Sequence, residues 1–250
     1  MKKTITTIVS MLMALSFVFA VSMPLYANIE EYGTNSLGLG MDDLVNQSTI
    51  TIVNDKGLQV DVDIEPNAVG KITIAEVLDT ANAVYEVGQK ITIHNIGYSR
   101  AYSRDSVISF DDIRGYTDPY VYPECGVNRV AKDVFIVSVA KGQIFTFNEP
   151  WAESYTLEIL KGVDPSLSIS ETLLKIDLGL LSTYSTTYTA STSTTFQGPP
   201  ESSEYNSREY RIKFYHRARN FRVTVNGERE YGMFWEPRHY AVYSIDKTVS

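Results

Sequence analysis

The strongest constraint on the fold is a long run, residues 176–196, in which the character of the side chain alternates at every second position. Within residues 182–195, 11 of 14 residues are Ser or Thr, and no charged residue occurs between Asp177 and Glu201. β-Branched Thr and aromatic Tyr favour an extended backbone and disfavour a helix. The run therefore predicts a β-strand, or strands divided by a bend, with two faces that meet different surroundings.

A return strand follows this run after the turn-like residues 197–204. Over residues 210–217, aromatic or apolar side chains alternate with mostly cationic ones. The two halves predict an antiparallel hairpin over residues 182–219. Its aromatic side faces either the core of the protein or, in a membrane-inserting hairpin, the lipid. The aromatic residues expected to make this contact with a membrane or partner are Tyr184, Tyr188, Phe196, Tyr210 and Phe214.

Short β-runs separated by turn residues continue through the rest of the chain. The clearest pair is 50–53 with 58–64, where the intervening Asn-Asp-Lys-Gly indicates a hairpin. The stretch 75–85 has apolar spacing that fits either a helix or an extended segment. Together these runs predict an all-β fold, an antiparallel β-sandwich-like arrangement in one body or in two β lobes, with a long Ser/Thr-rich strand or hairpin. Further strands are predicted at residues 71–74, 90–94, 107–110, 134–140, 143–147, 155–160, 210–216, 221–225, 231–235 and 240–245.

The amino terminus has the layout of a secretory signal peptide. Lys2 and Lys3 precede an uncharged apolar run, and a helix-breaking region then ends at Ala27. We therefore expect cleavage after Ala27 and a secreted, extracellular product, with an uncleaved membrane anchor as the alternative. The predicted organisation is a signal peptide at 1–27, an N-terminal extension at 28–47, an N-terminal β region at 48–148 and a C-terminal β region at 149–250 that carries the Ser/Thr-rich hairpin.

The charge balance argues against nucleic acid as a partner. The chain has 22 basic and 30 acidic side chains, and loss of Lys2 and Lys3 with the leader leaves 20 basic ones, a net charge of −10. Nucleic-acid binding depends on cationic side chains that replace the counterions of the phosphates. A cell-surface glycan or protein is the expected partner, and a membrane is the partner under the pore-forming alternative.

No catalytic, cofactor or metal motif is recognised in the sequence. His94, His216 and His239 lie far apart, and Cys125 is the single cysteine, so an exported product has no internal disulfide. A nucleophile elbow, a P-loop and a dinucleotide fingerprint are all missing. The sequence thus predicts no catalytic residue, no cofactor and no metal, and it favours a protein that is not an enzyme. A carboxylate-based hydrolase is the alternative left open, because its two acidic side chains can come from any part of a chain.

The longest irregular stretch lies between residues 98 and 128 and is rich in tyrosine. Long loops within compact domains are often functional. Tyrosine presents an apolar ring and a polar hydroxyl, which suits contacts with sugars or proteins. The tyrosines expected to contact a ligand are Tyr98, Tyr102, Tyr116, Tyr120 and Tyr122.

Two resemblances are carried by particular strings of residues. The strings at 137–143 (Val-Ser-Val-Ala-Lys-Gly-Gln) and 198–214 (Gly-Pro-Pro-Glu-Ser-Ser-Glu-Tyr-Asn-Ser-Arg-Glu-Tyr-Arg-Ile-Lys-Phe) resemble a group of uncharacterised exported proteins of Gram-positive bacteria with β-rich C-terminal halves. This resemblance implies no activity. The Ser/Thr-rich amphipathic stretch 176–220 is similar in composition to the hairpins of aerolysin-type β-pore-forming toxins. The sequence predicts a secreted, non-enzymatic binding or surface-interaction protein, with a pore-former that inserts residues 182–219 as the alternative.

Overall fold

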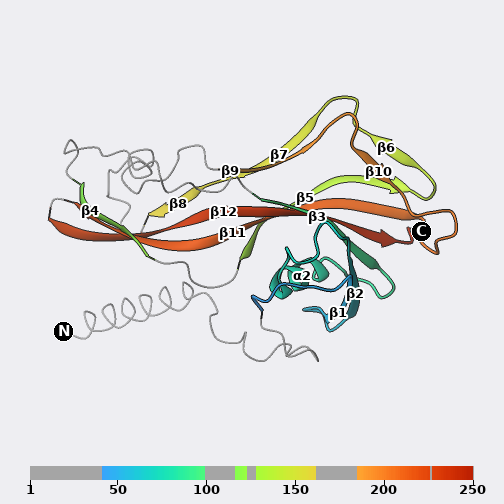
Figure 1. Ribbon diagram of the computed structural model, residues 1–250, viewed down its shortest axis with the longest axis horizontal. Helices are drawn as coiled ribbons and strands as arrows, with labels where there is room; N and C mark the ends of the chain where they lie inside the picture. Colours follow the sequence, from blue (N-terminus) through green and yellow to red (C-terminus); the bar gives the residue numbers. More distant parts are fainter. Residues whose placement is uncertain (1–40, 99–115, 123–127, 162–184, 226, 250) are drawn as a thin grey trace, which may run out of the picture. The chain divides into compact units, whose positions relative to one another are not determined.

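The computed structural model describes residues 41–98, 116–122, 128–161, 185–225 and 227–249 (Figure 1). They belong to one compact unit, residues 40–250, and consist mostly of strands with one short helix, which confirms the predicted β class at this level. The signal peptide predicted at 1–27 and the strand predicted at 107–110 lie outside the described residues. The elements are β1 (Thr49–Val53), β2 (Gln59–Ile64), α2 (Ile74–Ala81), β3 (Lys90–Tyr98), β4 (Tyr116–Val121), β5 (Arg129–Ala140), β6 (Ile144–Thr146), β7 (Trp151–Thr156), β8 (Glu158–Lys161), β9 (Ser185–Ala190), β10 (Thr195–Gln197), β11 (Ser207–Val225) and β12 (Glu228–Lys247).

A long antiparallel hairpin, β11 with β12, forms the middle of the largest sheet (Figure 1). The sequence predicts four separate strands here, but the two strands pair along their whole length. Gly227, in the connection, has a φ of 86°, a left-handed conformation that glycine adopts without steric cost. The register shifts where His216 meets Pro237, because proline lacks the N–H of a regular ladder.

The main sheet has the order β1-β2-β3-β12-β11-β4, with β5 also paired to β11 and β8 to β12. Neighbouring strands are antiparallel except β2 and β3, which run parallel. A parallel pair needs a crossover connection, and the segment that contains α2 supplies it. Both predicted β regions contribute strands, so the predicted boundary at residue 148 does not divide this sheet.

Helix α2 begins within the strand predicted at 71–74. The Thr73 hydroxyl accepts a hydrogen bond from the Glu76 N–H at 3.4 Å, and the Glu76 carboxylate accepts one from the Thr73 N–H at 3.0 Å. This reciprocal capping box stabilises the start of a helix. The helical interpretation of 75–85 is therefore confirmed, although the helix already ends at Ala81, and the strand predicted at 71–74 is wrong.

The two faces of the β11–β12 hairpin contact different layers (Figure 1). On one face, the Tyr215 hydroxyl donates to the carbonyl of Glu76 in α2 at 3.2 Å. On the other face, Ile212 and Phe214 join an aromatic core with residues of β5, β7, β9 and β10. Ring centroids in this core lie 5.0 Å apart for Phe196 with Tyr210. Around residues 212–215, protein therefore packs against both faces of β11.

The described part of the Ser/Thr-rich run, from residue 185 onward, forms two short strands, and neither pairs with the return strand. β9 pairs with β7, and β10 pairs with β6, whereas β11 pairs with β12, β4 and β5. The hairpin predicted over residues 182–219 is therefore wrong. The run is divided at a turn in which the Ser191 N–H donates to the Thr194 hydroxyl at 2.9 Å and the Thr194 N–H donates to the Ser191 carbonyl at 3.0 Å. Hydroxyl side chains that bond to the local backbone favour such turns over a continuous ladder.

The prediction of two unlike faces is confirmed for β9. Thr186, Tyr188 and Ala190 are buried, whereas the residues between them are exposed. The buried side meets the aromatic core, where Tyr188 contacts Tyr240 with ring centroids 5.3 Å apart. The period of two in the sequence thus identified the buried side of this strand, although it did not identify the partner strand.

A close backbone approach at Gly198 makes this position intolerant of a side chain. A Cβ atom there would lie 1.9 Å from the carbonyl oxygen of Ala140, and the Gly198 N–H donates to the Gln143 carbonyl at 2.9 Å. We expect Gly198→Ala to lower the free energy of unfolding by about 1–3 kcal/mol, the usual cost of overpacking. Urea unfolding measures this change.

The matched control for Gly198→Ala is Ser202→Ala in the turn that follows. Ser202 is exposed, so its replacement should change the free energy of unfolding by no more than about 0.5 kcal/mol. Equal stability of the Gly198→Ala chain and the parent chain would contradict the close approach.

Candidate functional site

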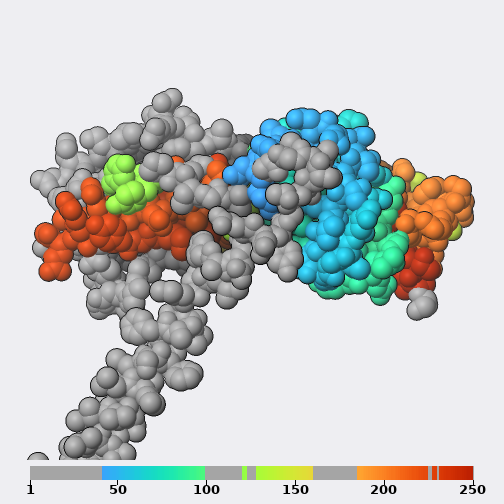
Figure 2. Space-filling model, turned by 90° about the horizontal axis from the view of Figure 1, so that it is seen from below, coloured from blue at the N-terminus to red at the C-terminus, as the bar shows by residue number. Residues whose placement is uncertain are grey.

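A polar cleft opens between the C-terminal end of α2 and strands β5, β11 and β12. Its volume is about 420 Å³, which falls within the roughly 300–1,000 Å³ of small-molecule sites. Figure 2 shows residues 41–98, coloured blue to green, as one block against the orange and red segments that include β10 to β12. The residues that line the polar cleft are Asp79, Asn82, Ala83, Tyr85, Gln89, Val130, Asp133, Glu209, Arg211, Lys213, Ile245 and Lys247.

The alternation along β11 brings three charged side chains to one face of the sheet. Glu209, Arg211 and Lys213 are two residues apart, and every second side chain of a strand points to the same side. Strand β5 adds Asp133, which lies opposite Lys213 in the ladder, and β12 adds Lys247. Charged groups from three adjacent strands therefore meet in the polar cleft.

Arg211 is the centre of this charged group. Its Nε donates to Asp133 Oδ1 at 3.0 Å, and its Nη1 donates to Glu209 Oε1 at 2.7 Å. The second Glu209 oxygen accepts from Lys247 Nζ at 2.5 Å, and the second Asp133 oxygen accepts from the Tyr243 hydroxyl at 2.9 Å. Burial raises the pKa of Glu209, but the bonds from Lys247 and Arg211 outweigh it and bring that pKa below its usual value. Glu209 is therefore held as a carboxylate.

Lys213 joins the strand to the helix. Only 4% of this residue is exposed, and its Nζ donates to the backbone carbonyl of Asp79 at 2.5 Å and lies 3.6 Å from Asp133 Oδ2. Burial lowers the pKa of Lys213, and the charges of Asp133 and Asp79 oppose this change. Burial raises the pKa of Asp79 to about 6, although the charges of Lys213 and Arg129 oppose it.

An exposed aromatic ring belongs to the lining of the polar cleft. Tyr85 is 72% exposed, and the Lys56 ammonium lies 4.3 Å from the centroid of its ring. Lys56 Nζ also bonds to Asp55 Oδ1 at 2.8 Å and to the Asn82 carbonyl at 2.7 Å. The Tyr85 N–H donates to Gln89 Oε1 at 3.2 Å. These contacts hold the ring in place and leave most of its surface open to a ligand.

A buried acid fixes α2 to the sheet. Glu76 Oε1 accepts a hydrogen bond from Asn128 Nδ2 at 2.7 Å and lies 3.2 Å from His239 Nε2, and the His239 ring stacks on Tyr215 at 5.0 Å between centroids. Burial raises the pKa of Glu76, but His239, Asn128 and the Thr73 N–H together lower it below its usual value. Because Asp79 lies in the same helix, these contacts also position one wall of the polar cleft.

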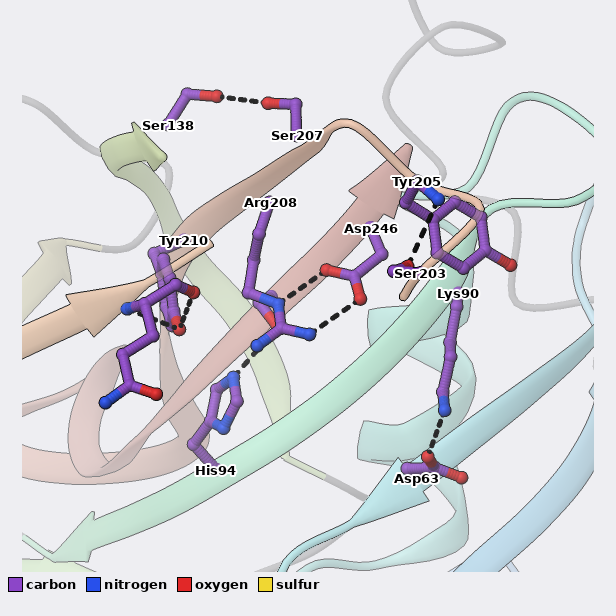
Figure 3. A network of polar contacts seen from close by, with 12 residues as sticks. Asp63, Lys90, His94, Ser138, Ser203, Tyr205, Ser207, Arg208, Tyr210 and Asp246 are labelled. Atoms are coloured by element: carbon purple, nitrogen blue, oxygen red, sulfur yellow. Dashed lines mark hydrogen bonds and ion pairs between the residues drawn. The ribbon is translucent and has the colours of Figure 1, made fainter. Parts of the chain in front are cut away.

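A second polar network joins residues of β3, β11 and β12 (Figure 3). Arg208 donates two hydrogen bonds to the buried Asp246, at 2.6 and 2.7 Å. His94 Nε2 lies 2.8 Å from Ser244 Oγ, and the His94 ring stacks on Tyr210 with centroids 5.4 Å apart. These contacts join β3, β11 and β12 side by side, and the polar cleft is lined by other residues. We therefore assign the network to stability.

The described tyrosines of the set predicted to contact a ligand are not part of the lining of the polar cleft. Tyr98 is 61% exposed at the end of β3. Tyr120 and Tyr122 form an edge-to-face pair with ring centroids 5.0 Å apart. Tyr116 begins β4, and Tyr102 lies outside the described residues. The structure thus does not bring the described members of this set into the lining of the cleft.

The aromatic residues predicted to face a membrane or a partner lie in the aromatic core where the structure describes them. They are Tyr188, Phe196, Tyr210 and Phe214, and Tyr184 lies outside the described residues. The residues of the polar cleft, in contrast, were not predicted. Asp79, Asp133 and Lys213 come from three separate elements, so no local motif joins them. The one available signal was the alternation over residues 210–217, where the cations Arg211 and Lys213 occupy one side of the strand and aromatic or apolar residues the other.

Within the described ranges, no helix combines the length and apolar character needed to cross a membrane. The same ranges hold no group of three or more His, Cys, Asp or Glu side chains placed to bind a metal ion. No family model matches the chain, and neither a curated protein nor a solved structure gives a match.

Proposed function

We propose that this chain is an exported, non-enzymatic binding protein and that the polar cleft holds a saccharide unit of a cell-surface glycan. The observation that carries this proposal is that charged hydrogen-bonding groups and the exposed ring of Tyr85 line one cleft of about 420 Å³. Export rests on the signal-peptide layout of residues 1–27.

The lining of the polar cleft suits a ligand that is rich in hydroxyl groups. A hydroxyl both donates and accepts hydrogen bonds, so it pairs with carboxylates such as Glu209 and with cations such as Arg211. Hydrogen bonds to charged groups are roughly twice as strong as those between neutral groups. The C–H side of a sugar ring is apolar and packs on an aromatic ring such as Tyr85. A polyanion fits less well, because three carboxylates accompany the three cations of the lining.

The packing supports binding in preference to membrane insertion. Tyr188, Phe196 and Phe214 are at most 8% exposed, so insertion would first have to remove them from the aromatic core. We infer a β-sandwich-like arrangement for this core, in which β6, β7, β9 and β10 cover one face of the main sheet. A packed core behind the sheet makes the cleft on the other face rigid, and rigid sites lose less entropy on binding.

The test is an array of neutral, acidic and amine-bearing oligosaccharides probed with the chain from residue 28 onward. We expect binding by the parent chain and a loss of about tenfold or more in affinity for Tyr85→Ala, by analogy with nucleobase stacking on an aromatic ring, which contributes roughly 1–3 kcal/mol. Tyr85 is 72% exposed, so its loss should leave the thermal unfolding midpoint unchanged.

Tyr231→Ala is the matched control, since Tyr231 is 54% exposed and lies outside the lining of the cleft. It should bind as the parent chain does. Equal losses in the two variants would contradict the assignment of the polar cleft as the site. Release of reducing ends from a bound oligosaccharide would overturn the non-enzymatic part of the proposal and favour the carboxylate-based hydrolase.

A further inference from the structure

We propose that the polar cleft selects saccharides that carry a protonated amine, and that the Asp79 carboxylate receives this amine. The inference rests on the proposed function and makes it more specific. The charged groups that line the cleft are paired with one another except at a single position.

The charged side chains that β5, β11 and β12 contribute to the cleft form ion pairs with one another. Arg211 bonds to Asp133 and Glu209, Lys247 bonds to Glu209, and Lys213 lies within 3.6 Å of Asp133. No cation of the three is left without a carboxylate. An anionic group of a ligand would therefore have to displace an existing ion pair.

Asp79 is the exception. In the described part of the chain its carboxylate forms no hydrogen bond and no ion pair, and the contact with Lys213 Nζ uses its backbone carbonyl instead. The side chain is half-buried and lines the cleft. A partly desolvated carboxylate without a partner is costly when it is charged, and a cationic ligand removes that cost.

A ligand ammonium at Asp79 would give its carboxylate the direct ion pair that it does not have among the described residues. At about 4 Å the attraction between two unit charges near a protein surface is several-fold larger than in bulk water. The neighbouring hydroxyls of a sugar would meet Asn82 and Gln89, whose amides both donate and accept. An amino sugar combines both kinds of group on one ring.

The titration of Asp79 gives the proposal a second readout. Its pKa is raised to about 6 by burial, against the opposing charges of Lys213 and Arg129 and with a further increase from Glu76. The other charged groups of the lining are Asp133, Glu209, Arg211 and Lys247. Below pH 6 Asp79 is mostly neutral and attracts an ammonium weakly, so binding of an amine should strengthen as the pH rises from 5 to about 7.

The experiment compares three methyl glycosides, those of glucosamine, N-acetylglucosamine and glucose, by NMR titration of the full chain from residue 28. At pH 6.8 we expect glucosamine glycoside to bind about tenfold more tightly than the other two. Between pH 6.8 and pH 5.0 its affinity should fall roughly fivefold to tenfold, whereas that of glucose glycoside should stay constant.

Asp79→Asn should remove the preference for the amine and the pH dependence of the affinity for glucosamine glycoside. It should leave the binding of glucose glycoside unchanged. Asp61→Asn, an exposed carboxylate of β2 outside the cleft, is the matched control and should behave as the parent chain. Equal affinities for the three glycosides would overturn the amine preference but leave the proposed function standing. Binding of none of the three, together with no signal on the oligosaccharide array, would overturn both.

Discussion

Phe214→Ala is expected to lower the free energy of unfolding by about 3–5 kcal/mol, the usual cost of removing a buried aromatic side chain. Phe214 is fully buried at the centre of the aromatic core, where its ring lies 6.2 Å from that of Tyr240. Truncation leaves a cavity bounded by the main sheet and by strands β7, β9 and β10, and the surrounding rings cannot all move to fill it. Urea unfolding followed by tryptophan fluorescence measures the effect, because Trp151 packs against the same core.

Phe135→Ala is the matched control for this experiment. Phe135 lies in β5, which pairs with β11, but it is 50% exposed. Its truncation should therefore cost less than about 1 kcal/mol. If both variants lost a similar amount of free energy of unfolding, the position of Phe214 in the aromatic core would be contradicted.

Glu76→Ala is the second change for which we expect a large effect, a loss of about 3–5 kcal/mol. The carboxylate accepts hydrogen bonds from Asn128 and the Thr73 N–H and lies 3.2 Å from His239. Removing it leaves these buried polar groups without their partner and removes half of the capping box. Glu86→Ala, an exposed glutamate that follows the helix, is the control and should have little effect.

The contribution of Glu76 should also depend on pH with a definite sign. Its pKa in the folded protein is lower than in the unfolded chain, because the contacts with His239, Asn128 and Thr73 outweigh burial. Such a group stabilises the fold fully above its unfolded pKa, about 4.3–4.5, and loses this contribution as the pH falls through the folded value. The stability difference between the parent chain and Glu76→Gln should therefore shrink between pH 6 and pH 3. A difference that grows on acidification would contradict the assignment.

The sequence predicted strands well where the signal was local. The hairpin of β1 and β2 was predicted from two alternating runs around Asn-Asp-Lys-Gly, and its strands do pair, with Val53 opposite Gln59. The helix was only one of two interpretations of 75–85, and its local capping box of Thr73 and Glu76 was not recognised. In contrast, the partner of β9 is β7, and nothing in the composition of either strand specifies that choice. A period-two alternation of apolar and polar residues indicates that one side of a strand is buried. It does not specify the neighbouring strand, because many strands can pack against that side.

The polar cleft was beyond prediction for a related reason. Lys213 and the residue whose carbonyl it contacts, Asp79, are 134 positions apart. Their meeting depends on the crossover that places α2 against the β11–β12 hairpin, and that is a property of the whole sheet. The cationic residues within 210–217 were recognised as one side of an amphipathic strand. Only the tertiary structure shows that this side is covered and that its charges find carboxylates there.

The position of β11 and β12 after all the other elements has a kinetic consequence. Every layer closes on this pair, and contacts such as that of His94 with Ser244 join residues 150 positions apart. The entropy of closing such loops is lost before most of the stabilising contacts form, so we expect refolding in the range of about milliseconds to seconds. During synthesis, β3 and β5 are made before β12 and β11, the strands with which they pair. We therefore expect a nascent chain of this design to remain incompletely folded until β11 and β12 have been made.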